Sequence, residues 1–366
     1  MTTETVSAMI QTKRLSYVRT VYNIMAKHVS QSGSKAPTLK DVAGRAGVHF
    51  VTASVVLNNA KYGTRVSAET RQRILRAAEE MQYQPSAVSK SFQTRRSNVV
   101  GFYSDFKTTA LENPFIARVV SSLRDCCSIK GYDLLIHCHN APETLNKRTA
   151  REAFLGSKTL GLIIHSPDES PLMRYLAETY LPVIAINDAS KIFPSVVMDD
   201  LSGGCIIAEF IHSRSARRIL YLDKIFPTSS STRRRDGFLQ KAAELGLIVQ
   251  LIRVPGGWYD SPELMAYLHD AQNLPCIVVG WNDPSLESVV EACKDLSLRI
   301  PEDVSLIGFD GVNPLANYNG VLTTVVASWH KAAPFAVDLL EALTAGQEVP
   351  HETLLPVSLR VGDSTI

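Results

Sequence analysis

From Val99 to the C-terminus, short apolar runs alternate with longer stretches of helical periodicity, and this alternation limits the folds open to the chain. Eight runs have the length and content of buried strands: Val99–Tyr103, Leu134–His137, Leu160–Ile164, Pro182–Ile186, Ser195–Met198, Ile219–Leu222, Cys276–Val279 and Ser305–Phe309. Strands separated by helices predict parallel sheets that helices cover on both faces. Ligands of such folds bind at the carboxyl ends of the strands.

The residues before Val99 predict a small domain of three helices. Thr38 can cap the first helix, with Asp41 in its first turn, and Gly47 allows a tight turn into a second helix from Thr52 to Leu57. A third helix begins near Ser67 and ends before Pro85. The positions expected to face inward are Leu39, Val42, Ala43, Ala46, Ala53, Val56, Leu57, Ile74, Ala77, Ala78 and Met81. The pattern is that of a helix-turn-helix with a supporting third helix.

Charge divides the chain at the same place. Residues 1–98 contain 15 Lys and Arg but 5 Asp and Glu, whereas the remainder contains 23 basic and 31 acidic residues. A basic N-terminal part suits phosphate neutralisation on nucleic acid, and a solvated helical face is the alternative.

The chain therefore divides into four predicted parts. Residues 1–36 form an N-terminal extension, whose role as a docking helix or a flexible arm stays open. The helix-turn-helix domain spans 37–85, a short hinge helix and basic linker span 86–98, and the larger α/β domain spans 99–366.

Composition excludes several classes of protein. A chain of 366 residues with 45% apolar side chains can bury a full core in two or three domains. Neither a membrane span nor a secretion signal is evident, so we expect a cytoplasmic protein. The six cysteines have no metal-site spacing, and a strand would point Cys138 away from His137 and His139. We predict neither a metal site nor a cofactor.

Two sets of motifs, one in each main domain, resemble a single known family. The first set is Asp41-Val42-Ala43, Ala46-Gly47-Val48, Thr52, Val56-Leu57-Asn58, Val66-Ser67, Thr70-Arg71, Tyr83 and Pro85. The second is Asn113-Pro114-Phe115, Gly131-Tyr132-Asp133, Pro182-Val183, Asp199, Arg234 with Gly237-Phe238, Asn282-Asp283, Ile300 to Ser305, Gly308-Phe309-Asp310 and Leu322 to Val325. In order and spacing they resemble the LacI/GalR family of bacterial transcriptional repressors, from Thr38 through nearly the whole chain.

The resemblance implies an α/β protein with an N-terminal helix-turn-helix headpiece and a periplasmic-binding-protein-like effector domain of two doubly wound parallel-sheet subdomains. It implies a homodimeric, sequence-specific transcriptional regulator, expected to be a repressor and not an enzyme. Paired headpieces would lie in major grooves of double-stranded operator DNA, with hinge helices in the minor groove. A small-molecule effector in the cleft would change the angle between the subdomains.

The recognition helix departs from the family where base reading is expected. The resemblance places headpiece contacts to DNA at Thr38, His49, Phe50, Val51, Thr52, Ser54, Val55, Asn58 and Thr70. Family members usually carry Ser in place of His49 and Arg in place of Val55. Phe50, Val51 and Val55 cannot make bidentate hydrogen bonds to bases, but they can contact thymine methyl groups.

Two interpretations of this departure stay open. In the first, the headpiece reads an A·T-rich operator through apolar contacts and His49, while the hydroxyl and amide side chains bind phosphates. In the second, Phe50 and Val55 pack in the headpiece core or against residues 1–36, and base reading has weakened.

The hinge also departs from the family. Its predicted DNA contacts are Ser86, Ser89, Lys90 and Phe92, of which Phe92 replaces a Leu that enters the central base step. An aromatic wedge can also kink the minor groove, and core packing is the alternative for Phe92. The insertion Lys61–Arg65 is a further candidate for a backbone contact.

The effector contacts implied by the family are Asn113, Phe115, Arg234, Trp258, Asn282 and Asp310. Cationic, amide and carboxylate groups beside an indole suit a polyol, whose hydroxyls donate and accept, so a sugar is the first choice and a purine the second. Each residue also has a structural alternative: solvation for Arg234 within its arginine run, helix capping for Asp310, and a subunit interface for Trp258.

Three alternative functions remain open. An enzyme or sugar-binding protein on the same fold would have a degenerate headpiece, but no nucleotide loop or nucleophile elbow is present in the sequence. A transport protein would need an export signal. A regulator without a ligand would fill its cleft with its own side chains. The sequence identifies neither the operator, the effector, nor the direction of its action.

Overall fold

The computed structural model describes residues 37–57, 66–83, 97–105, 113–137, 147–155, 159–214, 218–254, 261–312, 315 and 317–366. The chain divides into two compact units, Met1–Arg95 and Arg96–Ile366. We call the described part of the first unit the headpiece and the second unit the body. The predicted helices within 1–36 and 86–92 lie outside the described residues.

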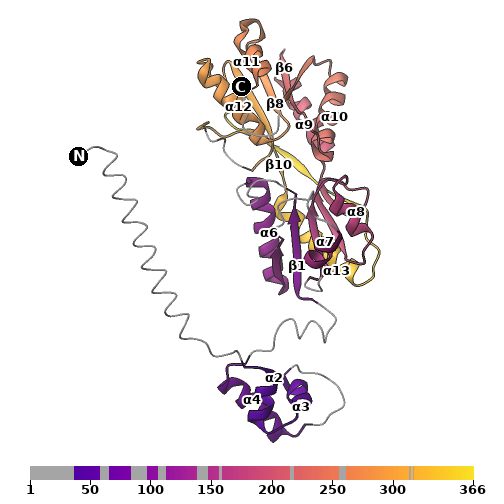
Figure 1. Ribbon diagram of the computed structural model, residues 1–366. Helices are drawn as coiled ribbons and strands as arrows, with labels where there is room; N and C mark the ends of the chain where they lie inside the picture. The colour runs from indigo at the N-terminus through magenta and orange to yellow at the C-terminus, as the bar shows by residue number, and fades with distance from the viewer. Residues whose placement is uncertain are drawn as a thin grey trace, which may run out of the picture. The chain divides into compact units, whose positions relative to one another are not determined.

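The headpiece consists of three short helices (Figure 1): α2 (Leu39–Ala46), α3 (Phe50–Leu57) and α4 (Ala68–Glu80). Thr38 and Asp41 form the capping box of α2, and the Ser67 side chain caps α4. Gly47 ends α2 with a φ of 65°, a conformation that glycine adopts without strain. The core contains Val42, Ala43, Ala46, Ala53, Val56, Ile74, Ala77 and Ala78, with Leu57 and Met81 packed against it. The inward-facing positions predicted from periodicity are therefore confirmed, and α3 begins two residues earlier than predicted.

The body contains two six-stranded sheets. Sheet A has the order β11-β5-β4-β3-β1-β2 and sheet B the order β12-β10-β9-β8-β6-β7. All pairings are parallel except that of β12 with β10. The strands of sheet A are β1 (Val99–Ser104), β2 (Asp133–Ile136), β3 (Gly161–His165), β4 (Val183–Asn187), β5 (Ser195–Met198) and β11 (Glu352–Leu355). Those of sheet B are β6 (Ile219–Lys224), β7 (Val249–Val254), β8 (Cys276–Gly280), β9 (Val304–Asp310), β10 (Thr323–Ala327) and β12 (Val357–Arg360). Mostly parallel sheets were predicted, and the prediction is confirmed.

Helices cover both faces of each sheet. The helices of sheet A are α6 (Pro114–Lys130) and α13 (Trp329–Thr344) on one face, with α7 (Lys147–Phe154) and α8 (Pro171–Ala177) on the other. Those of sheet B are α9 (Asp200–Ser213) and α10 (Ser229–Glu244), opposite α11 (Pro262–His269) and α12 (Glu287–Asp295). Short 3-10 helices η3 (Ala271–Asn273) and η4 (Asp283–Leu286) flank β8. Four buried clusters, one on each sheet face, result from this arrangement.

The chain passes between the two sheets three times. It leaves sheet A after β5 and enters α9, returns after β10 through α13, and crosses again between β11 and β12. Asp199, at the first crossing, caps α9 by accepting a hydrogen bond from the Ser202 amide (3.1 Å). Three connecting segments, near the ends of the two sheets, thus join the two halves of the body.

Two glycines let α9 and α10 approach closely. A Cβ on Gly204 would lie 2.1 Å from the carbonyl oxygen of Arg234 and 2.6 Å from the nitrogen of Phe238. A Cβ on Gly237 would lie 2.1 Å from the carbonyl oxygen of Leu201. All three obstructing atoms belong to the backbone, so the helices themselves would have to separate. This contact fixes the position of Arg234.

We expect Gly204→Ala to destabilise the body by about 1–3 kcal/mol, because it overpacks a helix contact that cannot relax through side chains. Urea unfolding followed by circular dichroism measures the change. Gly44→Ala is the matched control, since Gly44 lies in α2 with open space around its Cα and alanine favours a helix. Equal effects of the two substitutions would contradict this account of the contact.

Among the described residues, no helix combines the length and apolarity that a bilayer crossing requires. Cys126, Cys127, Cys205, Cys276 and Cys293 are free thiols, and all but Cys205 are buried. Cys138 and His139 lie outside the described residues. In the described part of the chain, no group of three or more His, Cys, Asp or Glu is placed to hold a metal ion.

Candidate functional site

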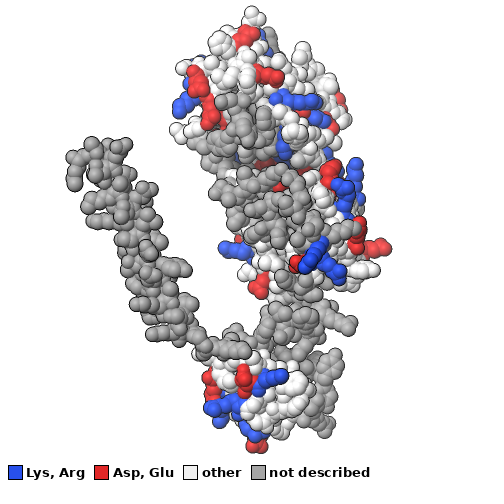
Figure 2. All heavy atoms as spheres, in the orientation of Figure 1, with Lys and Arg blue, Asp and Glu red and all other residues white. Residues whose placement is uncertain are grey.

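The two exposed side chains of α3 are apolar. Phe50 is 45% exposed and Val51 49% exposed, and neither belongs to the headpiece core. The sequence of α3, Phe50–Leu57, carries no charge, so the charged side chains that Figure 2 shows on the headpiece come from other segments. An uncharged exposed surface on the second helix of a helix-turn-helix is unusual, because polar side chains normally read base edges there.

His49 stands at the N-terminus of α3 and contacts the two residues that follow it. Its Nδ1 accepts a hydrogen bond from the Val51 amide (3.5 Å), and its ring lies 4.7 Å from the Phe50 ring, centroid to centroid. Since a backbone amide can only donate, the proton of a neutral His49 is on Nε2. The ring therefore presents a hydrogen-bond donor on its outer edge.

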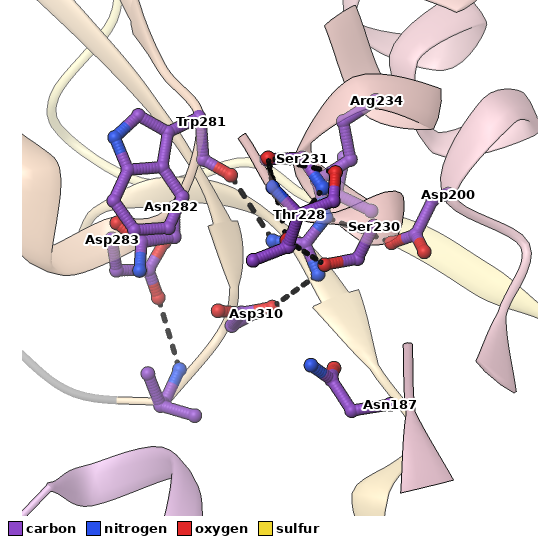
Figure 3. Close-up of polar contacts among 12 residues, drawn as sticks. Asn187, Asp200, Thr228, Ser230, Ser231, Arg234, Trp281, Asn282, Asp283 and Asp310 are labelled. Atoms are coloured by element: carbon purple, nitrogen blue, oxygen red, sulfur yellow. Dashed lines mark hydrogen bonds and ion pairs between the residues drawn. The ribbon is translucent and has the colours of Figure 1, made fainter. Parts of the chain in front are cut away.

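In the body, the polar centre is a cluster around Arg234, drawn in Figure 3. Arg234 is 4% exposed; its Nε donates to Asp200 Oδ1 (2.7 Å), and its Nη2 lies 2.9 Å from Asp310 Oδ1. Its Nη1 donates to the carbonyl oxygen of Trp281 (3.0 Å), and its Cζ lies 3.8 Å from the centroid of the Phe309 ring. We call these five residues the Arg234 cluster.

The Arg234 cluster combines a fixed charge with carboxyl groups that titrate. Burial raises the pKa of Asp200 to about 7 and also raises the pKa of Asp310, although the guanidinium acts against both shifts. Burial acts to lower the pKa of Arg234, but Asp310 and Asp200 outweigh it and hold that pKa above its ordinary value. The arginine thus stays charged at any physiological pH.

Backbone strain marks the same strand ends. Asp310, the last residue of β9, has a φ of 97°, and Asn187, the last residue of β4, has a φ of 78°. Left-handed backbone is uncommon for residues other than glycine and often occurs at functional sites. Both residues lie at carboxyl ends of parallel strands, where ligands of such folds bind.

Asp188 joins the two halves of the body. It follows β4 of sheet A, yet its Oδ1 accepts a hydrogen bond from the Ser230 amide at the N-terminus of α10 (2.9 Å). Its Oδ2 lies 3.4 Å from Nε2 of His165, at the end of β3. Burial would raise the pKa of Asp188, but His165 and the Ser230 amide hold it below its usual range.

Two further contacts join the halves. Arg118 of α6 donates to the carbonyl oxygen of Val312, which follows β9. Arg233 of α10 makes two hydrogen bonds, of 2.8 and 2.7 Å, with Glu352 of β11. Movement of one half against the other must therefore break or exchange hydrogen bonds that carry charge.

Both units match known families. Residues 38–86 match the family described as "Bacterial regulatory proteins, lacI family", and residues 208–365 match the "Periplasmic binding protein-like domain". The chain belongs to the LacI family of bacterial regulatory proteins. It is a DNA-binding transcriptional regulator of that family.

Relatives of this LacI-family chain cover most of its length. It is 26% identical over 324 residues to the HTH-type transcriptional repressor PurR of Pectobacterium atrosepticum, covering 86% of this chain and 92% of that protein. The PurR of Proteus mirabilis is 28% identical over 312 residues, covering 83% and 89%. The fold is similar to that of the Lac repressor dimer bound to operator and the anti-inducer ONPF, with a TM-score of 0.76, 24% identity, and coverage of 90% and 99%. The CelR–cellobiose complex gives a TM-score of 0.63 at 21% identity, with the same coverage.

The structure places the predicted DNA contacts on the three headpiece helices. Thr38 is exposed as the cap of α2; His49, Phe50 and Val51 are exposed at the start of α3; and Thr52, Ser54 and Val55 are half-buried along it. Thr70 lies in the first turn of α4, where its hydroxyl accepts a hydrogen bond from Ser67 (2.9 Å). The core-packing alternative for Phe50 finds no support in the described headpiece. Asn58, Ser86, Ser89, Lys90 and Phe92 lie outside the described residues.

The predicted effector contacts divide into two groups. Arg234 and Asp310 form an ion pair, and Asn282 stands beside them as the cap of η4, its Oδ1 accepting from the Ser285 amide (2.9 Å). Asn113 caps α6, and the Phe115 ring packs edge-on against His165 and Trp329. Trp258 lies outside the described residues. The solvated alternative for Arg234 is wrong, since that side chain is buried.

Several polar residues of this region were missed. Asp200, His165, Asp188 and Lys224 were not predicted, although three of them stand at or directly after the end of an observed strand, β3, β4 or β6. Lys224 Nζ lies 5.0 Å from the Trp281 ring centroid, and burial lowers the pKa of Lys224. The rule that ligands meet strand ends would have found these residues if applied to every strand.

Proposed function

We propose that this chain represses transcription as a homodimer that binds operator DNA through α3 and is controlled by a small molecule at the Arg234 cluster. One observation carries the proposal: a LacI-type headpiece and a two-sheet ligand-binding body occur in one chain, in family order. A regulator that binds the chromosome has to share its compartment, so we place the protein in the bacterial cytoplasm.

The headpiece supplies the reading surface, and flanking segments supply most of the charge. Of the net charge of +10 on residues 1–98, +1 belongs to the described headpiece, and +9 belongs to segments 1–36, 58–65 and 84–96. Phosphate neutralisation governs affinity for any duplex, whereas base-edge contacts govern preference among sequences. We therefore assign affinity mainly to the basic segments and preference to His49, Phe50, Val51 and Val55.

This division predicts different outcomes for two variants. Lys90→Ala should weaken binding to all duplexes alike and reduce the slope of log K against log salt by about one. Val51→Ala should leave that slope unchanged and alter preference at one or two base pairs. Fluorescence anisotropy with a specific and a random duplex, across a salt series, measures both. If both variants lower the two affinities equally, the division is wrong.

For the effector we propose a sugar bound by Arg234, Asn282 and Asp310. Guanidinium and carboxylate groups converge at the carboxyl ends of β8 and β9, where each sugar hydroxyl can accept from one and donate to the other. Asn113, Phe115 and Trp258 are proposed for the remaining contacts. A purine-type effector is the second choice.

A specific observation also favours a version without a ligand. Arg234 already donates to Asp200 and to the Trp281 carbonyl, and Asp188 already occupies the N-terminus of α10. In this version the chain's own side chains occupy the ligand site and hold the body in the conformation that binds operator DNA.

Two experiments test the proposal. Selection of genomic fragments by the purified dimer should return a preferred duplex, whose neighbouring genes indicate the class of effector. Calorimetry against a panel of sugars and nucleobases should then find one ligand that binds the protein. The same ligand should change the affinity of the protein for its operator. If the protein binds its operator but no compound of the panel binds the protein, the version without a ligand is favoured. Conversion of a sugar to a product would support the alternative that the chain is an enzyme.

A further inference from the structure

The exposed apolar surface of α3 limits which chemical groups it can recognise. Phe50 and Val51 are each nearly half exposed, and Val55 lies one helical turn after Val51. None of the three side chains can donate or accept a hydrogen bond. Their contacts must therefore be made to carbon.

The major groove offers one apolar group for such contacts. Among the unmodified base edges that line it, thymine alone carries a methyl group, and the features that distinguish the other bases are hydrogen-bond donors and acceptors. Cytosine gains the same group when its C5 is methylated. A surface that reads this methyl group through hydrocarbon contacts does not sense which pyrimidine carries it.

We propose that α3 reads its operator as a pattern of pyrimidine 5-methyl groups, so that 5-methylcytosine replaces thymine at the bases that face Phe50, Val51 and Val55. The inference rests on the proposed function, since it requires α3 to enter the major groove. It makes methylation of operator cytosines a signal that raises the affinity of this regulator.

His49 adds a distinction at a neighbouring base. Its Nδ1 is occupied by the Val51 amide, so its outer edge donates through Nε2. Thymine presents the O4 acceptor beside its methyl group, whereas 5-methylcytosine presents the N4 donor there. The base that faces His49 must therefore be an acceptor, and at that position 5-methylcytosine does not replace thymine.

The chain itself offers a rival occupant for the apolar surface. Residues 1–36 contain the apolar series Leu15, Val18, Tyr22, Met25 and Val29 at helical spacing. We favour DNA because the surface lies on the second helix of the headpiece and because +9 of charge belongs to the segments that flank or interrupt the described headpiece.

The test replaces single bases in the preferred duplex and leaves the protein unchanged. Each operator pyrimidine is made in turn as thymine, uracil, cytosine and 5-methylcytosine, and the full-length dimer is titrated by fluorescence anisotropy. Loss of one buried methyl group should weaken binding about fourfold, and loss in both half-sites about fifteenfold. Cytosine methylation should restore the affinity lost on changing thymine to cytosine, except at the base that faces His49.

Two variants assign the effect to α3. Val51→Ala should reduce the ratio of thymine to uracil affinity at one position. Leu75→Ala is the matched control, because Leu75 is also 49% exposed but lies on α4, and it should leave every ratio unchanged.

The outcomes separate the two proposals. Specific binding with equal affinity for thymine and uracil at every position overturns the methyl reading and leaves the proposed function intact. If the ratio departs from one only after residues 1–36 are removed, the segment covers α3, and the inference is wrong for the full chain. The absence of any preferred duplex overturns the proposed function itself.

Discussion

Arg234→Met is expected to lower the free energy of unfolding of the body by about 3–5 kcal/mol at pH 8, the cost of removing one partner from a buried ion pair. Arg234 is 4% exposed and Asp200 2% exposed, with 2.7 Å between Nε and Oδ1. Methionine fills part of the volume, but it leaves the carboxyl groups of Asp200 and Asp310 facing each other without a cation. The loss should also remove any response to the effector.

The cost should depend on pH in a defined direction. Without the guanidinium, the pKa values of Asp200 and Asp310 rise further, and each carboxyl must take up a proton for the body to fold. Protons are more available at pH 5.5 than at pH 8, so the variant should approach the parent as the pH falls. Urea unfolding at both pH values measures the difference.

Neighbouring positions provide the controls. Arg233→Met removes the ion pair between Arg233 and Glu352, whose side chains are 33% and 31% exposed. It should lower the free energy of unfolding by less than about 1 kcal/mol. The double variant Arg234→Met/Asp200→Asn should recover part of the loss, because one uncompensated carboxylate is removed. If Arg233→Met and Arg234→Met cost the same, the buried cluster does not stabilise the body.

The sequence was sufficient for the elements that are buried on both faces or capped by local side chains. Runs such as Leu160–Ile164 are apolar throughout because helices cover both faces of β3, and Thr38 and Ser67 are caps that act within one turn. Four strands were not predicted: β7, β10, β11 and β12. β10 lies inside sheet B, and its two buried threonines, Thr323 and Thr324, break the apolar run. β7, β11 and β12 lie at sheet edges, where exposed residues such as Gln250 and Arg253 of β7 interrupt the apolar pattern.

The candidate site was predicted only in part, because its partners are distant in sequence. Three consecutive arginines of α10 look alike in the local sequence. In the structure, Arg233 meets Glu352, Arg234 meets Asp200 and Asp310, and Arg235 meets Asp223 and Asp236. The close approach of α9 and α10 determines which arginine is buried, and this is a property of tertiary packing. The family resemblance pointed to Arg234, but no local pattern points to Asp200 as its counter-ion.

The body is expected to lose stability as the pH rises from about 4 to about 7, in part because of Asp283. This residue is 1% exposed at the start of η4; its Oδ1 accepts from the Thr324 hydroxyl (2.6 Å) and its Oδ2 from the Val312 amide (2.9 Å). Burial, helped by the charge of Asp310, raises the pKa of Asp283 to about 7, while the two hydrogen bonds and Arg360 act in the opposite direction. In the unfolded chain the same carboxyl releases its proton near pH 4.

The two pKa values of Asp283, folded and unfolded, determine the direction in which stability changes with pH. Between pH 4 and pH 7 the unfolded state releases the proton that the folded state retains, so rising pH favours unfolding, by up to about 4 kcal/mol from this group. Asp283→Asn removes the titration and keeps both contacts, since its amide oxygen can accept from Val312 and its amide nitrogen can donate to Thr324. The variant should match the parent near pH 4 and exceed its stability at pH 8.

A carboxyl with the opposite shift is the control. Asp303 accepts hydrogen bonds from the backbone amide and the guanidinium of Arg299, which hold the pKa of Asp303 at about 2. Asp303→Asn should therefore lose stability at neutral pH, whereas Asp283→Asn gains it. Urea unfolding of the parent and both variants between pH 4.5 and pH 8 gives three curves. If the curve of Asp283→Asn has the same slope as that of the parent, Asp283 is ionised in the folded body at every pH tested, and burial does not govern its titration.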